Sequence, residues 1–151
     1  MAATMAHRIF DAPCPGARYH TRAGAYLIAV AGSKIALIQT PKGYFLPGGG
    51  LEPGETHAAC IRRECLEETG FRVRVGALLC SAESYLPHES IGYFHPVQHY
   101  YVGAFLEYAC APVETDHALV WLPCAEAAGR MFVEQQAWAV RRALEMAERE
   151  V

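Results

Sequence analysis

Three glutamates on one predicted helix are the residues of this sequence whose spacing is best suited to chemistry. Glu64, Glu67 and Glu68 stand at i, i+3 and i+4, which places three carboxylates on one face of a helix. Like charges so close together repel one another and cost stability unless a positive charge lies beside them. Arg63 is one such charge, but neighbours in sequence point about 100° apart around a helix, so we expect it to point away from Glu64. A divalent cation is the stronger partner.

The ligand chemistry of these carboxylates indicates a hard metal ion. Carboxylate oxygens suit Mg²⁺ or Mn²⁺, and Mg²⁺ fills its remaining positions with water and phosphate oxygens. For three glutamates alone, a solvated acidic helix face is the more common explanation. The preceding residues 46–50 read LPGGG, however, and glycines let backbone amides and carbonyls approach an ion or a phosphate without an intervening Cβ. A metal–phosphate site is therefore favoured.

The elements that position this group follow from turn residues and hydrophobic patterns. The helix is predicted over 56–69, a stretch without Gly or Pro, and Gly70 is a suitable C-terminal cap. A glycine- and proline-rich loop, 40–55, precedes it. The other predicted elements are strands at 19–30, 34–40, 71–86, 97–108 and 118–123, a loop at 87–96 and a helix at 133–150.

Length and composition indicate one globular domain. The chain has 151 residues and a net charge of −3, with 52% hydrophobic and 19% charged residues, which excludes a disordered, collagen-like or coiled-coil chain. Strands and helices in this order predict an α/β protein with a mixed sheet packed against helices. Residues 1–17 hold three prolines or glycines and no hydrophobic period. They are predicted to be a loose lead-in to a single domain over 18–151.

Several locations and partners are not expected. No apolar run reaches the ~18 residues that a membrane span needs, and the N-terminus lacks the apolar core of a signal peptide. The six cysteines form no C-x-x-C pair, so we expect reduced thiols and neither disulfides nor a zinc site. We therefore expect a cytoplasmic chain without a membrane partner. Its negative charge argues against nucleic-acid binding.

Residues 49–71 resemble the Nudix box, G-x5-E-x7-R-E-U-x-E-E-x-G-U, in which U is a bulky aliphatic residue. The matching residues are Gly49, Glu55, Arg63, Glu64, Glu67, Glu68, Gly70 and Phe71. Cys65 stands at the first U position, a departure that we expect to affect packing and not chemistry. Similar surroundings extend the resemblance from about residue 20 to residue 148. It implies the Nudix (MutT-like) fold, an α/β/α sandwich with a mixed β-sheet between helices.

The resemblance also implies an activity and roles for the box residues. The activity is hydrolysis of the diphosphate of a nucleoside diphosphate linked to another moiety, such as ADP-ribose, a (d)NTP or a nucleotide sugar. Glu64, Glu67 and Glu68 would bind Mg²⁺, or Mn²⁺ in its place, together with the carbonyl of Gly49, and would activate a water molecule. Glu64, or next Glu67, is the expected general base. Arg63 and Glu55 are expected to orient the helix and loop, and Gly70 to have a structural role.

Substrate recognition is expected outside the box. Tyr44 and Phe45 are candidates for stacking on a base, although a core position for Phe45 is equally open. Tyr85 and Glu114 are further candidates for substrate binding. Glu107 and Glu114 are candidates for an extra ligand or base, although surface acids without such a role are more common. Substrate identity stays open.

Two further alternatives remain. One is a non-catalytic Nudix-like module that binds nucleotides or regulates; the intact charged positions of the box favour the enzyme. The other concerns assembly, because many relatives dimerise. Trp138 on the last predicted helix would then lie in a homodimer interface, or else in the core.

Overall fold

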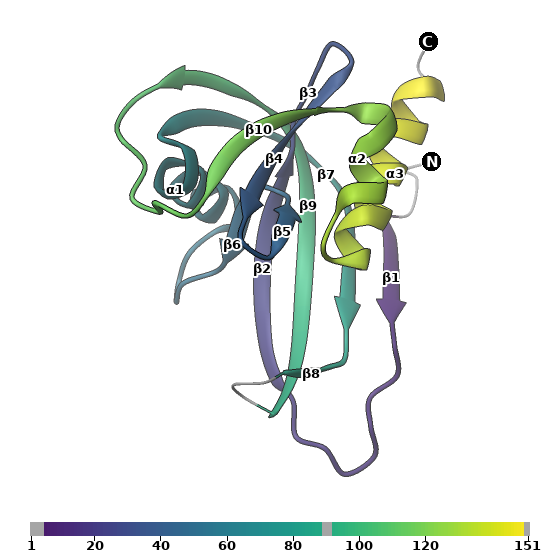
Figure 1. Ribbon diagram of the computed structural model, residues 1–151. Coiled ribbons are helices and arrows are strands. Elements are labelled where there is room, and N and C mark those ends of the chain that lie inside the picture. The colour runs from purple at the N-terminus through teal and green to yellow at the C-terminus, as the bar shows by residue number, and fades with distance from the viewer. Residues whose placement is uncertain (1–4, 89–91, 150–151) are drawn as a thin grey trace.

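The computed structural model describes residues 5–88 and 92–149 of the chain (Figure 1). The strands, in chain order, are β1 (Ala6–Phe10), β2 (His20–Ile28), β3 (Val30–Ala31), β4 (Lys34–Thr40), β5 (Gly43–Phe45), β6 (Gly48–Gly50), β7 (Phe71–Ser84), β8 (Leu86–His88), β9 (Gly92–Tyr108) and β10 (Ala118–Pro123). The helices are α1 (His57–Thr69), α2 (Cys124–Arg130) and α3 (Glu134–Arg149).

The strands of the described residues form two sheets. The larger one has the order β1-β7-β9-β2-β6, with β8 beside β9, and it is mixed because β1 pairs parallel with β7 and β2 parallel with β9. The smaller sheet has the order β10-β4-β3, with β5 beside β4, and its pairs are antiparallel. Figure 1 shows the strands between α1 on one side and α2 and α3 on the other. The predicted α/β class with a mixed sheet is confirmed, whereas the separate antiparallel sheet was not expected.

The core has two layers because strand side chains alternate between faces. Ala25 and Leu27 of β2 pack in the layer under α1, which also contains Cys65. Ile28 packs in the opposite layer, with Val140 of α3. Cys65 is fully buried at the position where the box has a bulky aliphatic residue, so the sulfur there serves packing.

Helix α1 begins and ends where the sequence predicts. The side chain of Thr56 caps the N-terminus by accepting a hydrogen bond from the Ala59 amide. Gly70 ends the helix in the left-handed conformation, with φ 79°, and a Cβ there would lie 2.0 Å from the carbonyl oxygen of Cys110. The Gly70 carbonyl in turn accepts from the Ala109 amide at 2.7 Å, which ties the end of α1 to the segment after β9.

Several short elements were not predicted. Strand β1 lies within residues 1–17, so the prediction of a loose lead-in is wrong for Ala6–Phe10; this strand is mostly exposed and carries no apolar alternation. The division of the chain after residue 17 stays a prediction. Strand β8 and the start of β9 fall in the predicted loop 87–96, of which residues 89–91 lie outside the described part. Strands β5 and β6 fall in the predicted loop 40–55, and α2 was missed.

Two further expectations concern thiols and membranes. All six cysteines are free, as predicted. Among the described residues, no helix has the length and apolar character needed to cross a membrane.

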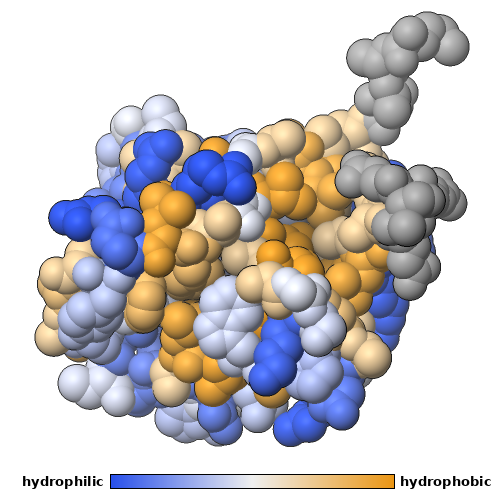
Figure 2. Space-filling view, turned by 90° about the horizontal axis from the view of Figure 1, so that it is seen from above, coloured by the Kyte–Doolittle hydropathy of each residue, from blue (hydrophilic) through white to orange (hydrophobic). Residues whose placement is uncertain are grey.

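Apolar residues gather around a hollow on the face that Figure 2 presents. Exposed apolar side chains of the molecule include Met5, Val30 and Met146, each more than a third exposed.

Trp138 packs against the core layer of α3 and meets the Phe10 ring edge-on, with ring centroids 6.2 Å apart. The homodimer stays a prediction, and Trp138 serves the core.

Candidate functional site

Arg63 joins the carboxylates of the helix to the loop before it. Its Nε and Nη2 donate to the two oxygens of Glu55 at 2.8 and 2.9 Å. Its Nη1 donates to Glu64 at 2.9 Å and to Glu67 at 3.3 Å. Its Nη2 also donates to the Gly50 carbonyl at 3.1 Å. Hydrogen bonding from Arg63 lowers the pKa of Glu55 to about 2, so this carboxylate is a permanent anion that holds the arginine in place.

The contact between Arg63 and Glu64 corrects the expectation from helical angles. The two side chains leave the helix about 100° apart. The arginine side chain is long enough to fold back, and its Nη1 reaches Glu64 Oε1. Arg63 is therefore a counter-charge for the acidic face, although one cation faces several carboxylates.

Glu114 joins the acidic face from a distant part of the chain. One carboxylate oxygen from each of Glu64, Glu67 and Glu114 lies within 4.8 Å of the others. The backbone places Glu114 there, because the amides of Val113 and Glu114 donate to the Glu67 carbonyl at 2.9 and 3.0 Å. We call these three glutamates the acidic group.

The acidic group fits a divalent cation. Burial raises the pKa of Glu64, Arg63 opposes that rise, and the charges of Glu67 and Glu114 add to it. A cation among the three carboxylates would relieve this repulsion. The donors are all oxygens, the ligands that Mg²⁺ and Mn²⁺ prefer.

Glu68 points toward the glycine strand β6. Its Oε1 accepts from the Gly48 amide at 3.0 Å, and its Oε2 lies 3.4 Å from Nδ1 of His117. Its side chain is only 7% exposed, and desolvation raises the pKa of Glu68 to about 9. Without a metal ion, Glu68 therefore keeps its proton at neutral pH. Its oxygens do not belong to the acidic group. Because a carboxylate must be deprotonated to bind a metal ion, Glu68 can share a metal ion with the acidic group only after it loses this proton.

The raised pKa of Glu68 predicts how the stability of the metal-free protein depends on pH. The unfolded chain ionises this carboxyl near the ordinary value of 4.5, whereas the folded chain keeps the proton up to about 9. The stabilising contribution is therefore complete below 4.5 and is lost as the pH rises through 9. In this window the free energy of unfolding should fall by up to about 1.4 kcal/mol per pH unit for this one proton.

Urea unfolding of the protein in a chelator, at a series of pH values, checks this prediction. The Glu68→Gln variant keeps a neutral acceptor for the Gly48 amide and should lose this part of the pH dependence. The Glu107→Gln variant changes an exposed carboxylate on β9 and should retain it. Parallel stability profiles for wild type and Glu68→Gln would show that Glu68 ionises normally.

Strand β6 consists of glycines because its backbone passes too close to Glu64 of α1 and to β2 for a side chain to fit. A Cβ on Gly49 would lie 2.5 Å from the carboxylate carbon of Glu64. Gly48 has a φ of 140°, and a Cβ there would lie 2.3 Å from the Ala25 carbonyl of β2. The Gly49 carbonyl accepts from the Cys60 thiol at 3.4 Å. The glycines therefore bring bare backbone next to the carboxylates, as the sequence predicts.

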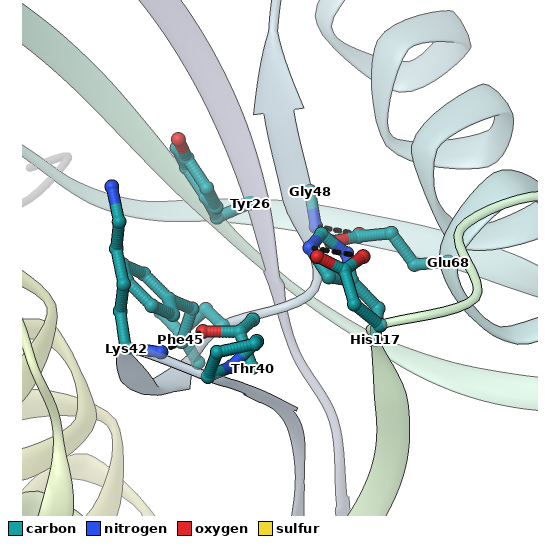
Figure 3. A pocket seen from close by; sticks show the side chains of 10 residues that line it. Tyr26, Thr40, Lys42, Phe45, Gly48, Glu68 and His117 are labelled. Atoms are coloured by element: carbon teal, nitrogen blue, oxygen red, sulfur yellow. Dashed lines mark hydrogen bonds and ion pairs between the residues drawn. The ribbon is translucent and has the colours of Figure 1, made fainter.

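A cavity of about 450 Å³ opens beside Glu68 and is lined from both sheets. Its lining residues are Tyr26, Thr40, Pro41, Lys42, Phe45, Leu46, Gly48, Glu68, Asp116 and His117. Figure 3 shows Lys42 and Phe45 on one side and Glu68 and His117 on the other. Such a cavity, with an aromatic ring and a few polar groups, is of the size that binds small molecules.

Of the four predicted substrate residues, Phe45 and Glu114 lie at the candidate site, whereas Tyr44 and Tyr85 do not. Phe45 lines the cavity and also packs against Phe132, with ring centroids 5.3 Å apart. One side chain therefore both forms the cavity wall and contributes to the packing behind it. Glu114 belongs to the acidic group. Tyr44 does not line the cavity; the guanidinium of Arg130 covers its ring at 5.3 Å.

Tyr85 lies away from the cavity and the acidic group. Its ring stacks on that of His95 at 4.2 Å, and its hydroxyl donates to Glu83 at 3.2 Å. It lies between β7 and β8, at the end of the molecule opposite β3 (Figure 1). The structure therefore gives no support to substrate binding by Tyr85.

Sequence reasoning missed several residues of the cavity, among them Tyr26, Lys42, Asp116 and His117. The sequence did offer a sign for Lys42, since it is one of only two lysines in the chain and lies within the glycine- and proline-rich loop 40–55. Asp116 and His117 stand directly before β10, beside Glu114. Tyr26 looks like an ordinary strand residue in the sequence. Glu107, the other acid considered, forms an exposed ion pair with Arg72 at 3.2 Å.

Comparison with known proteins adds to this geometry. The family model described as NUDIX domain matches residues 18–144. A curated relative, nucleoside triphosphatase NudI of Enterobacter sp. (strain 638), is 42% identical over 55 residues. That match covers 36% of this chain and 38% of the relative, so the aligned part spans little more than a third of either protein.

Solved structures share the arrangement of elements. A NUDIX hydrolase from Nitrosomonas europaea superposes with a TM-score of 0.65 at 20% identity, covering 82% of this chain and 90% of that one. A MutT NUDIX hydrolase from Burkholderia pseudomallei gives a TM-score of 0.63 at 25% identity, covering 82% and 98%. The first likeness shows the fold alone.

Proposed function

The chain belongs to the Nudix family, and from this premise we propose that it is a divalent-metal-dependent pyrophosphohydrolase. Its substrate would contain a nucleoside diphosphate linked to another moiety, as in ADP-ribose, a (d)NTP or a nucleotide sugar. The observation that carries the proposal is the convergence of Glu64, Glu67 and Glu114, within 4.8 Å, beside a cavity of about 450 Å³. The name of the triphosphatase relative supports the nucleotide class.

The residues proposed to hold the metal are the acidic group, Glu68 once it has lost its proton, and the Gly49 carbonyl. Mg²⁺ is the expected ion, with Mn²⁺ as a substitute. When bound, it would neutralise diphosphate charge and lower the pKa of water at the site. Glu114 extends the ligand set expected from the box.

The protein's own groups would position the reactants and move the proton. Glu64 is the proposed general base, and its carboxylate takes the proton of the attacking water; Glu67 is the next candidate. Arg63 is a positioning residue, since its Nη1 donates to both carboxylates.

The cavity is the proposed nucleoside site. The Phe45 ring offers a stacking surface, and Lys42 offers a cation for a phosphate. Asp116 and His117 offer polar groups for the edge of a base. Tyr44 and Tyr85 have no part in this arrangement.

The function is tested by incubating the protein with Mg²⁺ and a panel of (d)NTPs, ADP-ribose, nucleotide sugars and dinucleoside polyphosphates. Products separated by anion-exchange chromatography should show cleavage within the phosphate chain of at least one class. A chelator should abolish cleavage, and Mg²⁺ or Mn²⁺ should restore it. Binding of a panel member without any cleavage would favour the non-catalytic module. A cytoplasmic location and a homodimer remain expectations from sequence.

A further inference from the structure

A second, smaller hollow lies on the mixed sheet beside the cavity. Its volume is about 150 Å³. Its lining residues are Arg22, Ala23, Gly24, Tyr26, Gly50, Phe94, Pro96 and Gln98. Tyr26 lines both spaces, and Figure 3 shows its hydroxyl pointing away from Glu68 and His117. The ring of Tyr26 thus separates the two spaces, and its hydroxyl belongs to the smaller one.

Arg22 brings an unopposed cation to this hollow. Its guanidinium lies directly over Gly50, where an added Cβ would be 2.2 Å from Nε and 2.5 Å from Cζ. Within residues 5–88 and 92–149, no carboxylate forms an ion pair with it. Arg63, in contrast, is fully engaged by glutamates. Arg22 therefore has its hydrogen-bond donors available for a ligand.

A buried network fixes the direction of the hydrogen bonds at the hollow. Gln98 Oε1 accepts from the Tyr100 hydroxyl at 2.7 Å and from Gln136 Nε2 at 3.3 Å. Gln136 is itself fixed, because its Oε1 accepts from the Leu46 amide at 2.8 Å. The amide nitrogen of Gln98 must therefore face the hollow, where it donates to the Tyr26 oxygen at 3.4 Å.

The same network leaves the Tyr26 hydroxyl as a donor. Its oxygen already receives a hydrogen bond from Gln98, so its own proton is available for another acceptor. Burial raises the pKa of Tyr26, which keeps that proton in place. Gly24 allows the position of the ring, since a Cβ there would lie 3.0 Å from Cε2 and 3.4 Å from the hydroxyl.

We propose that this hollow is a phosphate subsite in which Arg22 and Tyr26 bind a phosphoryl group of the substrate beyond the diphosphate at the acidic group. A guanidinium, a hydroxyl proton and an amide nitrogen suit an oxyanion, and no carboxylate is among the described residues that line the hollow. The inference rests on the proposed function, because it takes the substrate to be a nucleotide. It predicts a preference for nucleotides with more than two phosphoryl groups over those with two.

Direct binding of inorganic tripolyphosphate tests the subsite without any turnover. Calorimetric titration of the full chain, in a chelator, should give measurable binding at millimolar concentrations. Arg22→Gln should weaken it about tenfold and Tyr26→Phe a few fold, as expected for hydrogen bonds to a charged group. Arg72→Gln is the matched control, because Arg72 is an exposed arginine that pairs with Glu107. Its affinity should equal that of wild type.

Two outcomes of the titration would overturn the subsite. One is an absence of binding to wild type at millimolar tripolyphosphate. The other is equal affinity of the Arg22→Gln and Arg72→Gln variants. Either result is independent of whether the protein is an enzyme, so failure of the subsite is distinguished from failure of the proposed function.

Kinetics with Mg²⁺ provide the second readout. Arg22→Gln should raise KM about tenfold for a nucleoside triphosphate and leave KM for ADP-ribose unchanged, since only the triphosphate has the additional phosphoryl group. An equal rise for both substrates would contradict the subsite. If wild type cleaves neither, the proposed function fails and the titration alone decides on the subsite.

Discussion

Replacing Glu64 by glutamine is expected to lower kcat by about 10²–10⁴-fold, the contribution typical of a general base. The change removes the proton acceptor and one oxygen ligand of the acidic group, and keeps the size of the side chain. The amide of glutamine can still accept from Arg63, whose Nη1 lies 2.9 Å from the present carboxylate. The fold should therefore persist, as circular dichroism would show.

A control distinguishes this effect from a general loss of charge. Glu107→Gln removes the same charge from an exposed ion pair on β9 and should leave kcat unchanged. The measurement is steady-state kinetics with saturating Mg²⁺ on the substrate that the panel identifies. Full activity of Glu64→Gln would remove Glu64 from both of its proposed roles.

Replacing Arg63 by glutamine is expected to have the second largest effect, a loss of about 10–100-fold in metal affinity or activity. Arg63 touches no substrate in the proposed mechanism. It holds Glu55, Glu64 and Glu67 together with the Gly50 carbonyl, by hydrogen bonds of 2.8–3.3 Å. Without it, the carboxylates repel one another with no counter-charge and lose their arrangement.

Arg62→Gln is the matched control, since Arg62 is the exposed neighbour on the same helix and carries the same charge. It should leave both metal affinity and kcat close to wild type. Titrations with Mn²⁺ distinguish a positioning effect of Arg63 from an effect of net charge. A positioning effect appears as weaker metal binding in Arg63→Gln, which excess Mn²⁺ partly overcomes. Equal effects of the two substitutions would mean that net charge, and not the contacts of Arg63, is responsible.

What the sequence predicted well is local along the chain. Thr56 and Gly70 delimit helix α1. The side-chain oxygen of Thr56 caps the first turn, and the left-handed backbone of Gly70 ends the last turn, so both act close to their own position in the sequence. The glutamates of the box share a face because of helix geometry. The glycines of β6 could be placed beside them because the connecting loop is short.

What the sequence could not predict depends on distant segments. The sequence makes Glu114 a candidate ligand, but no residue pattern predicts the pairing that brings it to the acidic group, in which the amides of Val113 and Glu114 donate to the Glu67 carbonyl. Glu68 differs from Glu64 and Glu67 through burial against Gly48, which sequence spacing does not reveal. Tyr85 is a predicted substrate residue, yet its partners in the structure, His95 and Glu83, belong to another part of the sheet.

Hydrolysis in isotopically labelled water tests the central claim most directly. The protein is incubated with Mg²⁺ and the preferred nucleotide in water enriched in a heavy oxygen isotope, and the masses of the products are measured by mass spectrometry. The account predicts one label in a phosphate product of wild type, little product with Glu64→Gln, and none in a chelator. Labelled product that forms equally in the chelator, or with Glu64→Gln, would contradict metal-assisted attack of water at this site.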